Sequence, residues 1–569
     1  MEEENNNNNN GISNNSSINK KLKLPIFVFF KDARLVLKMD ELAKEILGIA
    51  LPSALAVAAD PIASLIDSAF IGHLGPVELA AAGVAIALLN QASRITIFPL
   101  VSITTSFVAE EDTIENLNIK ALEKEFIEDV EKGTIVQHIS NNKSPKDFLA
   151  TNNNNNGSAA DDENVEKHAI VNFDGNNNNN GQEDGKLNKF SSANRSKNKI
   201  EAEKVGKKKR NIASASTALL FGTILGLLQA SILIFAAKPL LAIMGLKLDS
   251  PMRDPAEKYL KLRCIGAPAY LLSLAIQGIF RGFKDTTTPL YVILAGYSLN
   301  VALDPLFIFV LKFGIRGAAF SHVISQYIMA TTLLFLLTKK VYLLPPRLKD
   351  LQIFRFLTNG GLLLMRVVAV TFCTTFAASL ASRLGPIPMA AFQTCLQVWL
   401  TSSLLADGLA VAVQAILACS FTEKDYKKAA SSATRTLQMS FVLGLFLTFL
   451  VAFGLYFGAG LFSKNHQVVQ LIRLGTSFVA ATQSINTLAF VFDGVNYGAS
   501  DFAYSAYSLV LVSIVSISTE FVLYKFEQFI GIWIALAIYI TLRMFAGVWR
   551  MGTGTGPWRF LRGDSYSIL

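Results

Sequence analysis

Acidic and amide side chains interrupt two of the apolar stretches of this chain. Asp60 and Asp67 are seven residues apart in one stretch, and Asn300 and Asp304 are four apart in another, so each pair lies on one face of a helix. A carboxylate at the centre of a membrane helix costs about 3 kcal/mol even on lenient scales, so such residues are usually functional. Facing one cavity, the four would form a proton relay or a small-cation site. The structural alternatives are that Asp304 caps a helix broken at Pro305 and that Asp67 lies at the water interface.

Two arginines, Arg94 and Arg366, lie too deep in apolar stretches to reach the surface easily. One alternative is structural pairing with the carboxylates of Asp60, Asp67 or Asp407. Otherwise the arginines offer permanently charged forks that suit carboxylate ligands. We expect the substrate site to contain both arginines and three amides: Gln91, Gln277 and Gln397.

The other polar residues of the apolar stretches are expected to have structural roles. Arg281 and Lys284 can extend to the surface, and a lone His322 is more often a packing residue. Pro52 and Pro61 each remove a backbone hydrogen bond from the first helix, which makes that helix bendable.

Two segments of the chain occur twice. Leu74–Ala81 returns as Leu384–Ala391, shifted by 310 positions, and Phe280–Gly282 resembles Phe492–Gly494, shifted by 212. Both pairs lie beside long apolar runs, so the sequence predicts a membrane protein built from two similar halves. The shifts differ by 98 residues, which predicts an insertion of that length in the first half.

Composition supports this prediction, since 51% of the residues are hydrophobic and 17% are charged, against about a quarter in soluble proteins. The net charge of +9 fits basic loops at a membrane surface rather than nucleic-acid binding. The four cysteines show no CxxC spacing, and the absence of a GxxxxGK[ST] motif excludes ATP hydrolysis through a phosphate loop. We therefore expect no enzyme activity and no cofactor, and transport driven by a gradient of protons or sodium.

The expected fold is an all-α polytopic membrane protein with twelve transmembrane helices in two six-helix lobes. The expected spans are roughly 42–69, 76–108, 211–237, 257–280, 286–311, 315–338, 353–382, 386–418, 432–458, 468–492, 502–525 and 530–550. The N-terminal lobe comprises 38–108 and 211–340, and the C-terminal lobe comprises 351–551. The remaining segments are a polar tail (1–37), a low-complexity loop (109–210) with a small helix around 114–131, a linker (341–350) and a C-terminal tail (552–569).

Basic residues set the expected orientation. Lysines and arginines between the sixth and seventh spans, between the eighth and ninth, and after the twelfth place both termini and the long loop in the cytoplasm. The segment between the third and fourth spans disagrees, because its basic residues, including Arg263, would then lie outside.

At these residues the chain resembles the multidrug and toxic compound extrusion (MATE) family. The likeness covers about 430 residues in both halves and rests on three motifs: Asp67–Gly75, Gly278–Thr286 and Asn300…Asp304-Pro305. The long insertion, preceded by Gln91–Leu100, is similar to that of the plant citrate-effluxing branch. The resemblance implies that Asp67, Asn300 and Asp304 form a proton or cation site and that Pro52 bends the first helix.

Two departures from the family affect the expected substrate. Arg366 occupies the approximate place of a glutamate in many plant drug-type members, which argues against organic cations. His322 replaces a threonine of many relatives, which argues against sodium ligation there. We therefore expect a monomeric plasma-membrane exporter of citrate in the lipid bilayer, coupled to proton entry. The alternatives are an exporter of organic cations or flavonoids, an anion channel and a lipid-headgroup flippase.

Overall fold

The computed structural model describes residues 29, 38–131, 210–244, 249–342, 352–462 and 465–562. Residues 1–113 and 211–569 form one compact unit, and 114–210 form another. The expected tail 1–37, apart from Phe29, lies outside the described residues. So do residues 132–209 of the long loop, most of the linker 341–350 and the end of the C-terminal tail.

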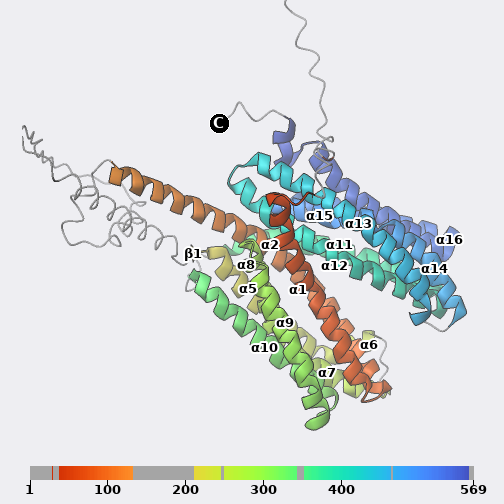
Figure 1. Ribbon diagram of the computed structural model, residues 1–569. Coiled ribbons are helices and arrows are strands. Elements are labelled where there is room, and N and C mark those ends of the chain that lie inside the picture. Colours follow the sequence, from red (N-terminus) through yellow and green to blue (C-terminus); the bar gives the residue numbers. More distant parts are fainter. Residues whose placement is uncertain are drawn as a thin grey trace, which may run out of the picture. The chain divides into compact units, whose positions relative to one another are not determined.

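Helices make up almost all of the described chain (Figure 1). The N-terminal lobe contains α1 (Glu41–Gly72), α2 (Pro76–Glu131), α5 (Ala213–Phe235), α6 (Ala237–Ile243), α7 (Arg253–Cys264), α8 (Ala267–Gly282), α9 (Thr287–Pro305), a π-helical turn (Leu306–Val310) and α10 (Ile315–Lys340). The C-terminal lobe contains α11 (Ile353–Arg383), α12 (Pro386–Thr422), α13 (Tyr426–Phe462), α14 (His466–Ala481), α15 (Gln483–Gly498), α16 (Phe502–Gly552) and a 3-10 helix (Gly556–Arg562). Two short strands, β1 (Arg210–Asn211) and β2 (Val341–Tyr342), pair with each other.

The helices account for twelve membrane crossings, as the sequence predicts. Nine helices of the described chain are long and apolar enough to span a membrane, and two bent pairs, α7 with α8 and α14 with α15, raise the number to eleven. Helix α16 has 51 residues and would extend about 76 Å at 1.5 Å per residue, although a bilayer core is about 30 Å thick. Its backbone leaves the helical region at Gln528, so α16 is two crossings joined at a kink.

Helix α2 does not end at residue 108, where we expected a loop to begin. It continues without a break to Glu131, because residues 109–131 contain neither proline nor glycine. The first residues beyond the expected boundary are part of the packed lobe. Ala109 is fully buried, and Glu111 accepts a hydrogen bond from the Ser214 amide of α5 at 2.9 Å.

The two lobes repeat the same turn, and this turn corrects the alignment of the halves. After α8, Lys284 has a φ of 58°, and after α15, Ser500 has a φ of 55°. The amides of Asp285 and Asp501, one residue later, each donate to the carbonyl five residues earlier. Equivalent residues of the α8–α9 and α15–α16 regions are therefore 216 positions apart, and the shift of 212 is wrong.

The close packing of α8 and α15 supports the corrected register. Gly278 and Gly494 are 216 positions apart, and a Cβ atom on either would meet the neighbouring helix α2 or α12 within 3.2 Å. Gly282 of α8 and Gly498 of α15, one turn further along, are equally close to α2 and α12. The match of Phe280–Gly282 to Phe492–Gly494 therefore aligned Gly282 with Gly494, although its true counterpart is Gly498, one helical turn later. The error arose because glycines four residues apart lie on the same helix face.

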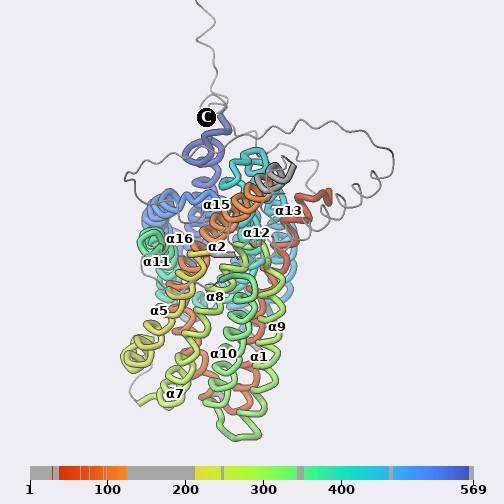
Figure 2. The backbone as a smooth tube through the Cα atoms, turned by 90° about the vertical axis from the view of Figure 1, so that its left-hand side faces the viewer, coloured from red at the N-terminus to blue at the C-terminus, as the bar shows by residue number. Residues whose placement is uncertain are grey.

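The lobes contact each other at one end, which we call the closed end. It is formed by Ile46–Ala54 of α1, Ser102–Glu110 of α2 and 408–419 of α12, which pack in shared apolar clusters. The Gln414 amide donates to the Ser102 carbonyl at 2.7 Å and to the Ser106 hydroxyl at 2.9 Å. Deeper in the N-terminal lobe, α1 leaves this interface and runs beside α9 (Figure 2).

Because α1 and α12 approach closely at the closed end, a single methyl group added at Gly408 should lower the stability of the protein. A Cβ atom at Gly408 would lie 2.5 Å from the Ala50 carbonyl oxygen, so Gly408→Ala should lower stability by about 1 to 3 kcal/mol through overpacking. Thermal unfolding of the purified protein in detergent measures the effect. Gly361→Ala in α11 is the control, because a Cβ there meets nothing within 4 Å. Equal melting temperatures for Gly408→Ala and the unsubstituted protein would contradict this close contact.

Candidate functional site

An acidic cluster lies in the N-terminal lobe where α1 packs against α9. Asp67 is 1% exposed, and Asn300 and Asp304 are fully buried. The Asn300 amide donates to Asp67 Oδ1 at 2.6 Å, and the carboxyl groups of Asp67 and Asp304 lie against each other. The structure thus brings together Asp67, Asn300 and Asp304, which are three of the four residues expected at a coupling site. The contact joins α1 to α9, more than 200 positions apart in the sequence.

Buried oxygens of this cluster lack hydrogen-bond donors. Among the described residues, Asp67 Oδ2, Asp304 Oδ2 and Asn300 Oδ1 have no hydrogen-bond partner. The other oxygen of Asp304 accepts a hydrogen bond from the Ser321 hydroxyl. Two adjacent negative charges repel, so the pair is most stable when one carboxyl group holds a proton, which also supplies a missing hydrogen bond.

Two basic side chains border the cluster, and neither was among the expected site residues. His322 Nδ1 of α10 is 3.6 Å from Asp67 Oδ2, and the Arg263 guanidinium of α7 is 3.9 Å from the same oxygen. Arg263 is held by a 2.7 Å hydrogen bond to the Tyr259 hydroxyl. His322 is thus part of the site rather than a packing residue, and the Arg263 side chain, which is 10% exposed, reaches the site from α7. The available signal was that charged residues in apolar helices require partners.

Asp60 belongs to a separate contact. It accepts a 2.6 Å hydrogen bond from the Tyr297 hydroxyl of α9, one helical turn before Asn300. No described interaction joins Asp60 to Asp67. Helix α1, which carries both aspartates, is continuous from Glu41 to Gly72 although it contains Pro52 and Pro61.

A basic cluster lies in the C-terminal lobe. Arg366 of α11 and Arg543 of α16 both form ion pairs with Asp493 of α15, and Arg366 also donates to the Tyr497 hydroxyl. Arg366 is 6% exposed. Its partner is therefore Asp493, and the alternative that Arg366 pairs with Asp60, Asp67 or Asp407 is wrong. In the sequence, Asp493 is the middle residue of the Phe492–Gly494 repeat, and no motif marks it as a charged partner of Arg366.

The basic cluster has more donors than acceptors. In the described part of the chain, Arg366 Nε, Arg543 Nε and the Tyr539 hydroxyl are buried without a hydrogen-bond partner. Arg543 also lies over the Phe490 ring, 4.6 Å from its centroid. Two guanidinium groups thus share one carboxylate, and Asp407 lies within electrostatic range of Arg543.

The remaining expected substrate residues lie on α2, α8 and α12. Gln91 on α2 and Gln397 on α12 are exposed, and Gln397 continues an exposed polar row with Gln393 and Thr401. A polar row on a membrane helix is costly against lipid, so we infer that it faces water. Arg94 lies within α2, but its side chain is outside the described part of the structure.

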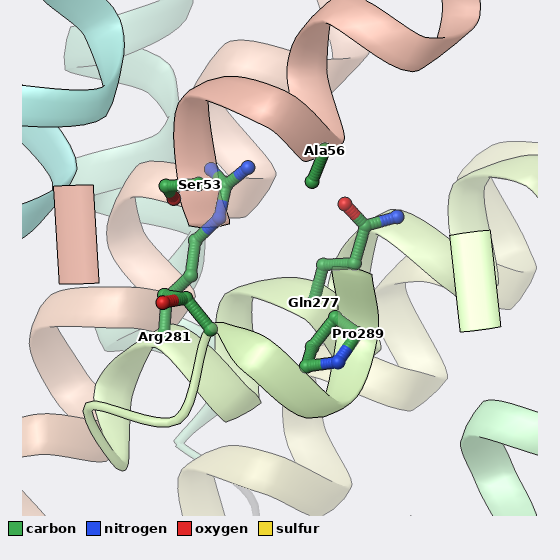
Figure 3. A pocket seen from close by; sticks show the side chains of 6 residues that line it. Ser53, Ala56, Gln277, Arg281 and Pro289 are labelled. Carbon is green, nitrogen blue, oxygen red and sulfur yellow. The ribbon is translucent and has the colours of Figure 1, made fainter. Parts of the chain in front are cut away.

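Gln277 lines a small pocket near the closed end (Figure 3). The pocket also contains Ser53 and Arg281, whose guanidinium lies beside Ser53 of α1 rather than extending to the surface. The space holds about one water molecule, which is too little for a tricarboxylate. Arg366 is not among the residues that line this pocket.

A two-lobe bundle of twelve membrane helices with buried charge clusters in both lobes defines a polytopic transporter. Comparisons with known proteins agree. A family model described as MatE matches residues 202–306 and 363–522. Protein DETOXIFICATION 42 of Arabidopsis thaliana is 54% identical over 95% of this chain and 97% of its own length. Protein DETOXIFICATION 43 from the same plant is 56% identical over 96% and 97%.

More distant relatives share the fold. Protein DETOXIFICATION 44, chloroplastic, of Arabidopsis thaliana is 38% identical over 92% of this chain and 84% of its own length. A crystal structure of MATE in the straight conformation matches with a TM-score of 0.65 at 15% identity, over 91% and 97% of the two chains. A MOP superfamily transporter from Pyrococcus furiosus, described by the reverse polarity of its binding pocket, matches with a TM-score of 0.65 at 17% identity, over 91% and 96%. The chain belongs to the MatE family of transporters, and it is not an enzyme.

Because Arg366 and Arg543 share the Asp493 carboxylate, we expect loss of its charge to destabilise the protein. Asp493→Asn removes the charge that compensates Arg366 and Arg543, so it should cost about 3 to 5 kcal/mol, as for other broken buried ion pairs. Arg543→Gln combined with Asp493→Asn should recover part of this loss, because one uncompensated charge is removed. Thermal unfolding of the unsubstituted protein, Asp493→Asn, Arg543→Gln and the double variant measures the coupling. Additive losses in the double variant would show that the two residues do not interact.

Proposed function

We propose that this transporter exports citrate, or a related small polycarboxylate, by proton-coupled alternating access between its lobes. The observation that carries the proposal is the pair of arginines that share one aspartate in the C-terminal lobe. Arginine forks bind carboxylates in a bidentate geometry and keep their charge at every physiological pH. A polycarboxylate would satisfy the free donors of Arg366, Arg543 and Tyr539.

The acidic cluster supports a role in coupling. Asp67 and Asp304 are in contact and share their surroundings with Asn300, so gain or loss of one proton changes the charge of a buried site. Such a change alters the packing of α1 against α9. Because α1 also packs against α12 at the closed end, a movement of α1 would alter the contact between the lobes. This link supports coupling of proton binding to alternating access.

Charge at the closed end supports the proposed orientation. Lys284 and Lys428 both pair with Glu45, and Arg435 lies 3.6 Å from Asp40. This concentration of lysine and arginine is typical of the cytoplasmic side. In a plasma membrane with a negative interior, each negative charge exported gains about 2.3 kcal/mol per 100 mV, which favours efflux of a polyanion. We propose that a monomer suffices, because each chain contains both lobes.

The acidic cluster is also the observation that favours the second candidate, an exporter of organic cations. Under that function, Asp67 and Asp304 would bind the substrate and the basic cluster would be structural. Efflux of labelled citrate, malate and tetraethylammonium from oocytes expressing the protein separates the candidates. Citrate efflux that saturates and follows the proton gradient supports our proposal, whereas efflux of tetraethylammonium alone supports the second.

Coupling through Asp67 and Asp304 predicts loss of uphill transport. Asp67→Asn and Asp304→Asn keep the side-chain size but remove the titratable charge, so export against a citrate gradient should collapse. The measurement is labelled citrate flux in vesicles with an imposed proton gradient. Asp254→Asn is the control, because the Asp254 side chain is 71% exposed. If both variants still pump citrate uphill at the original rate, the coupling carboxylates lie elsewhere.

Anion binding by Arg366 predicts a graded series. Arg366→Lys keeps a point charge without the fork and should weaken citrate transport partially, whereas Arg366→Ala should raise the apparent Michaelis constant about 10- to 100-fold. Arg366→Glu should abolish transport. Arg383→Ala, at an exposed position of the same helix, is the control. A folded Arg366→Ala variant with unchanged affinity and rate would assign Arg366 a purely structural role.

A further inference from the structure

A buried carboxyl group in the C-terminal lobe occupies the place that Asp304 has in the N-terminal lobe. The turns after α8 and α15 relate the two regions by a shift of 216, and this shift carries Asn300 to Ser516 and Asp304 to Glu520. The α11–α16 contact is likewise the counterpart of the α1–α9 contact. Glu520 is therefore equivalent to a coupling carboxylate, although no short motif marks it in the sequence.

The surroundings of Glu520 are neutral. Its side chain is fully buried, and Oε1 lies 3.1 Å from the Cys373 Sγ of α11 and 3.5 Å from the Ser516 hydroxyl. Within the described residues, Oε2 has no hydrogen-bond partner. The Tyr539 hydroxyl, in the second half of α16, is within electrostatic range of Cys373.

No basic side chain of the described chain forms an ion pair with Glu520. The buried arginines of this lobe, Arg366 and Arg543, pair with Asp493 instead. The shift of 310 that relates α1 to α11 places Ala377 opposite Asp67, so a second carboxylate is also missing. An ionised carboxylate without a partner is strongly unfavourable in such a place, and Glu520 is therefore protonated in this conformation.

The helix that carries Glu520 is interrupted nearby. The backbone of α16 is non-helical at Gln528, eight residues beyond Glu520, with a φ of 45°. Gly531, three residues later, packs closely against the Leu523 carbonyl. A Cβ atom added at Gly531 would lie only 2.2 Å from that carbonyl oxygen. A hinge at this position lets the two halves of α16 move separately, and such a movement would admit water to the α11–α16 contact.

We propose that Glu520 is a second proton-binding site, which takes up and releases one proton in the C-terminal lobe during each transport cycle. The inference rests on the proposed proton coupling and extends it from one lobe to both. Glu520 would hold its proton while buried between Cys373 and Ser516. It would release the proton when the movement of α16 exposes it to water.

The test counts protons moved per citrate in vesicles that contain the purified protein, from the reversal potential at several proton gradients. Glu520→Gln mimics the protonated side chain and should transport citrate with one proton fewer per molecule. Glu527→Gln, at an exposed position of the same helix, is the control and should keep the original ratio. A Glu520→Gln ratio equal to that of the unsubstituted protein would overturn the inference.

Parallel measurements separate this inference from the proposed function. If Asp304→Asn lowers the ratio and Glu520→Gln does not, only the inference about Glu520 is wrong. If citrate flux in the unsubstituted protein moves no protons, the proposed coupling itself is wrong and the inference about Glu520 falls with it.

Infrared difference spectra on alkalinisation provide a second readout that does not require Glu520→Gln to fold. Cys373→Ala removes a contact of Glu520 and should shift the carbonyl band of its protonated carboxyl group. An unchanged band would overturn the inference.

Discussion

The cost of a buried charge without a partner organises both lobes of this transporter. Asp67 and Asp304 are stable together only with help from Asn300, Ser321, His322 and Arg263. In the other lobe, Asp493 lies between two arginines for the same reason. Because an apolar interior penalises each unpaired charge by several kcal/mol, a change in protonation or the arrival of an anion must change the packing around it.

Close helix packing converts such local changes into contacts between the lobes. Helix α1 carries the acidic cluster at one end and packs against α12 at the other, where glycine allows the two backbones to approach. Polar contacts from Gln414 to Ser102 and Ser106 fix the same interface. A helix that takes part in both contacts can transmit a movement without any flexible connection, since packed helices shift as units.

Duplication gave the lobes the same helices, while substitution at equivalent positions gave them different chemistry. The α1–α9 contact holds Asp67 and Asp304, whereas the α11–α16 contact holds Ala377 and Glu520 at the corresponding places. The bent pairs α7–α8 and α14–α15 have similar bends of 46° and 49°, yet the second pair carries the landmark Asp493 with its two arginines. The cluster in one lobe thus centres on two carboxyl groups, and the cluster in the other centres on two guanidinium groups that share one carboxylate.

The sequence alone determined the class of fold and part of the site. Apolar length gave the twelve crossings, because a bilayer imposes a minimum on every spanning segment, and the repeated segments revealed two halves. Buried carboxylates were recognisable for the same physical reason, so Asp67, Asn300 and Asp304 were found without a structure. The small helix expected around 114–131 is also present, as the end of α2. Its continuity with the preceding span was readable as well, since residues 109–131 contain no proline or glycine.

Only the tertiary structure decided which charges meet. The pairing of Arg366 with Asp493, the contact of His322 and Arg263 with Asp67, and the isolation of Glu520 depend on how distant helices pack. Local composition carries no information about such contacts. The repeat register needed the structure as well, because a helix presents nearly the same face again after four residues, and a short motif fits equally well one turn away. Membrane helices are uniformly apolar on most sides, so their rotation and partners are set by a few polar contacts and glycines that become recognisable only when the bundle is assembled.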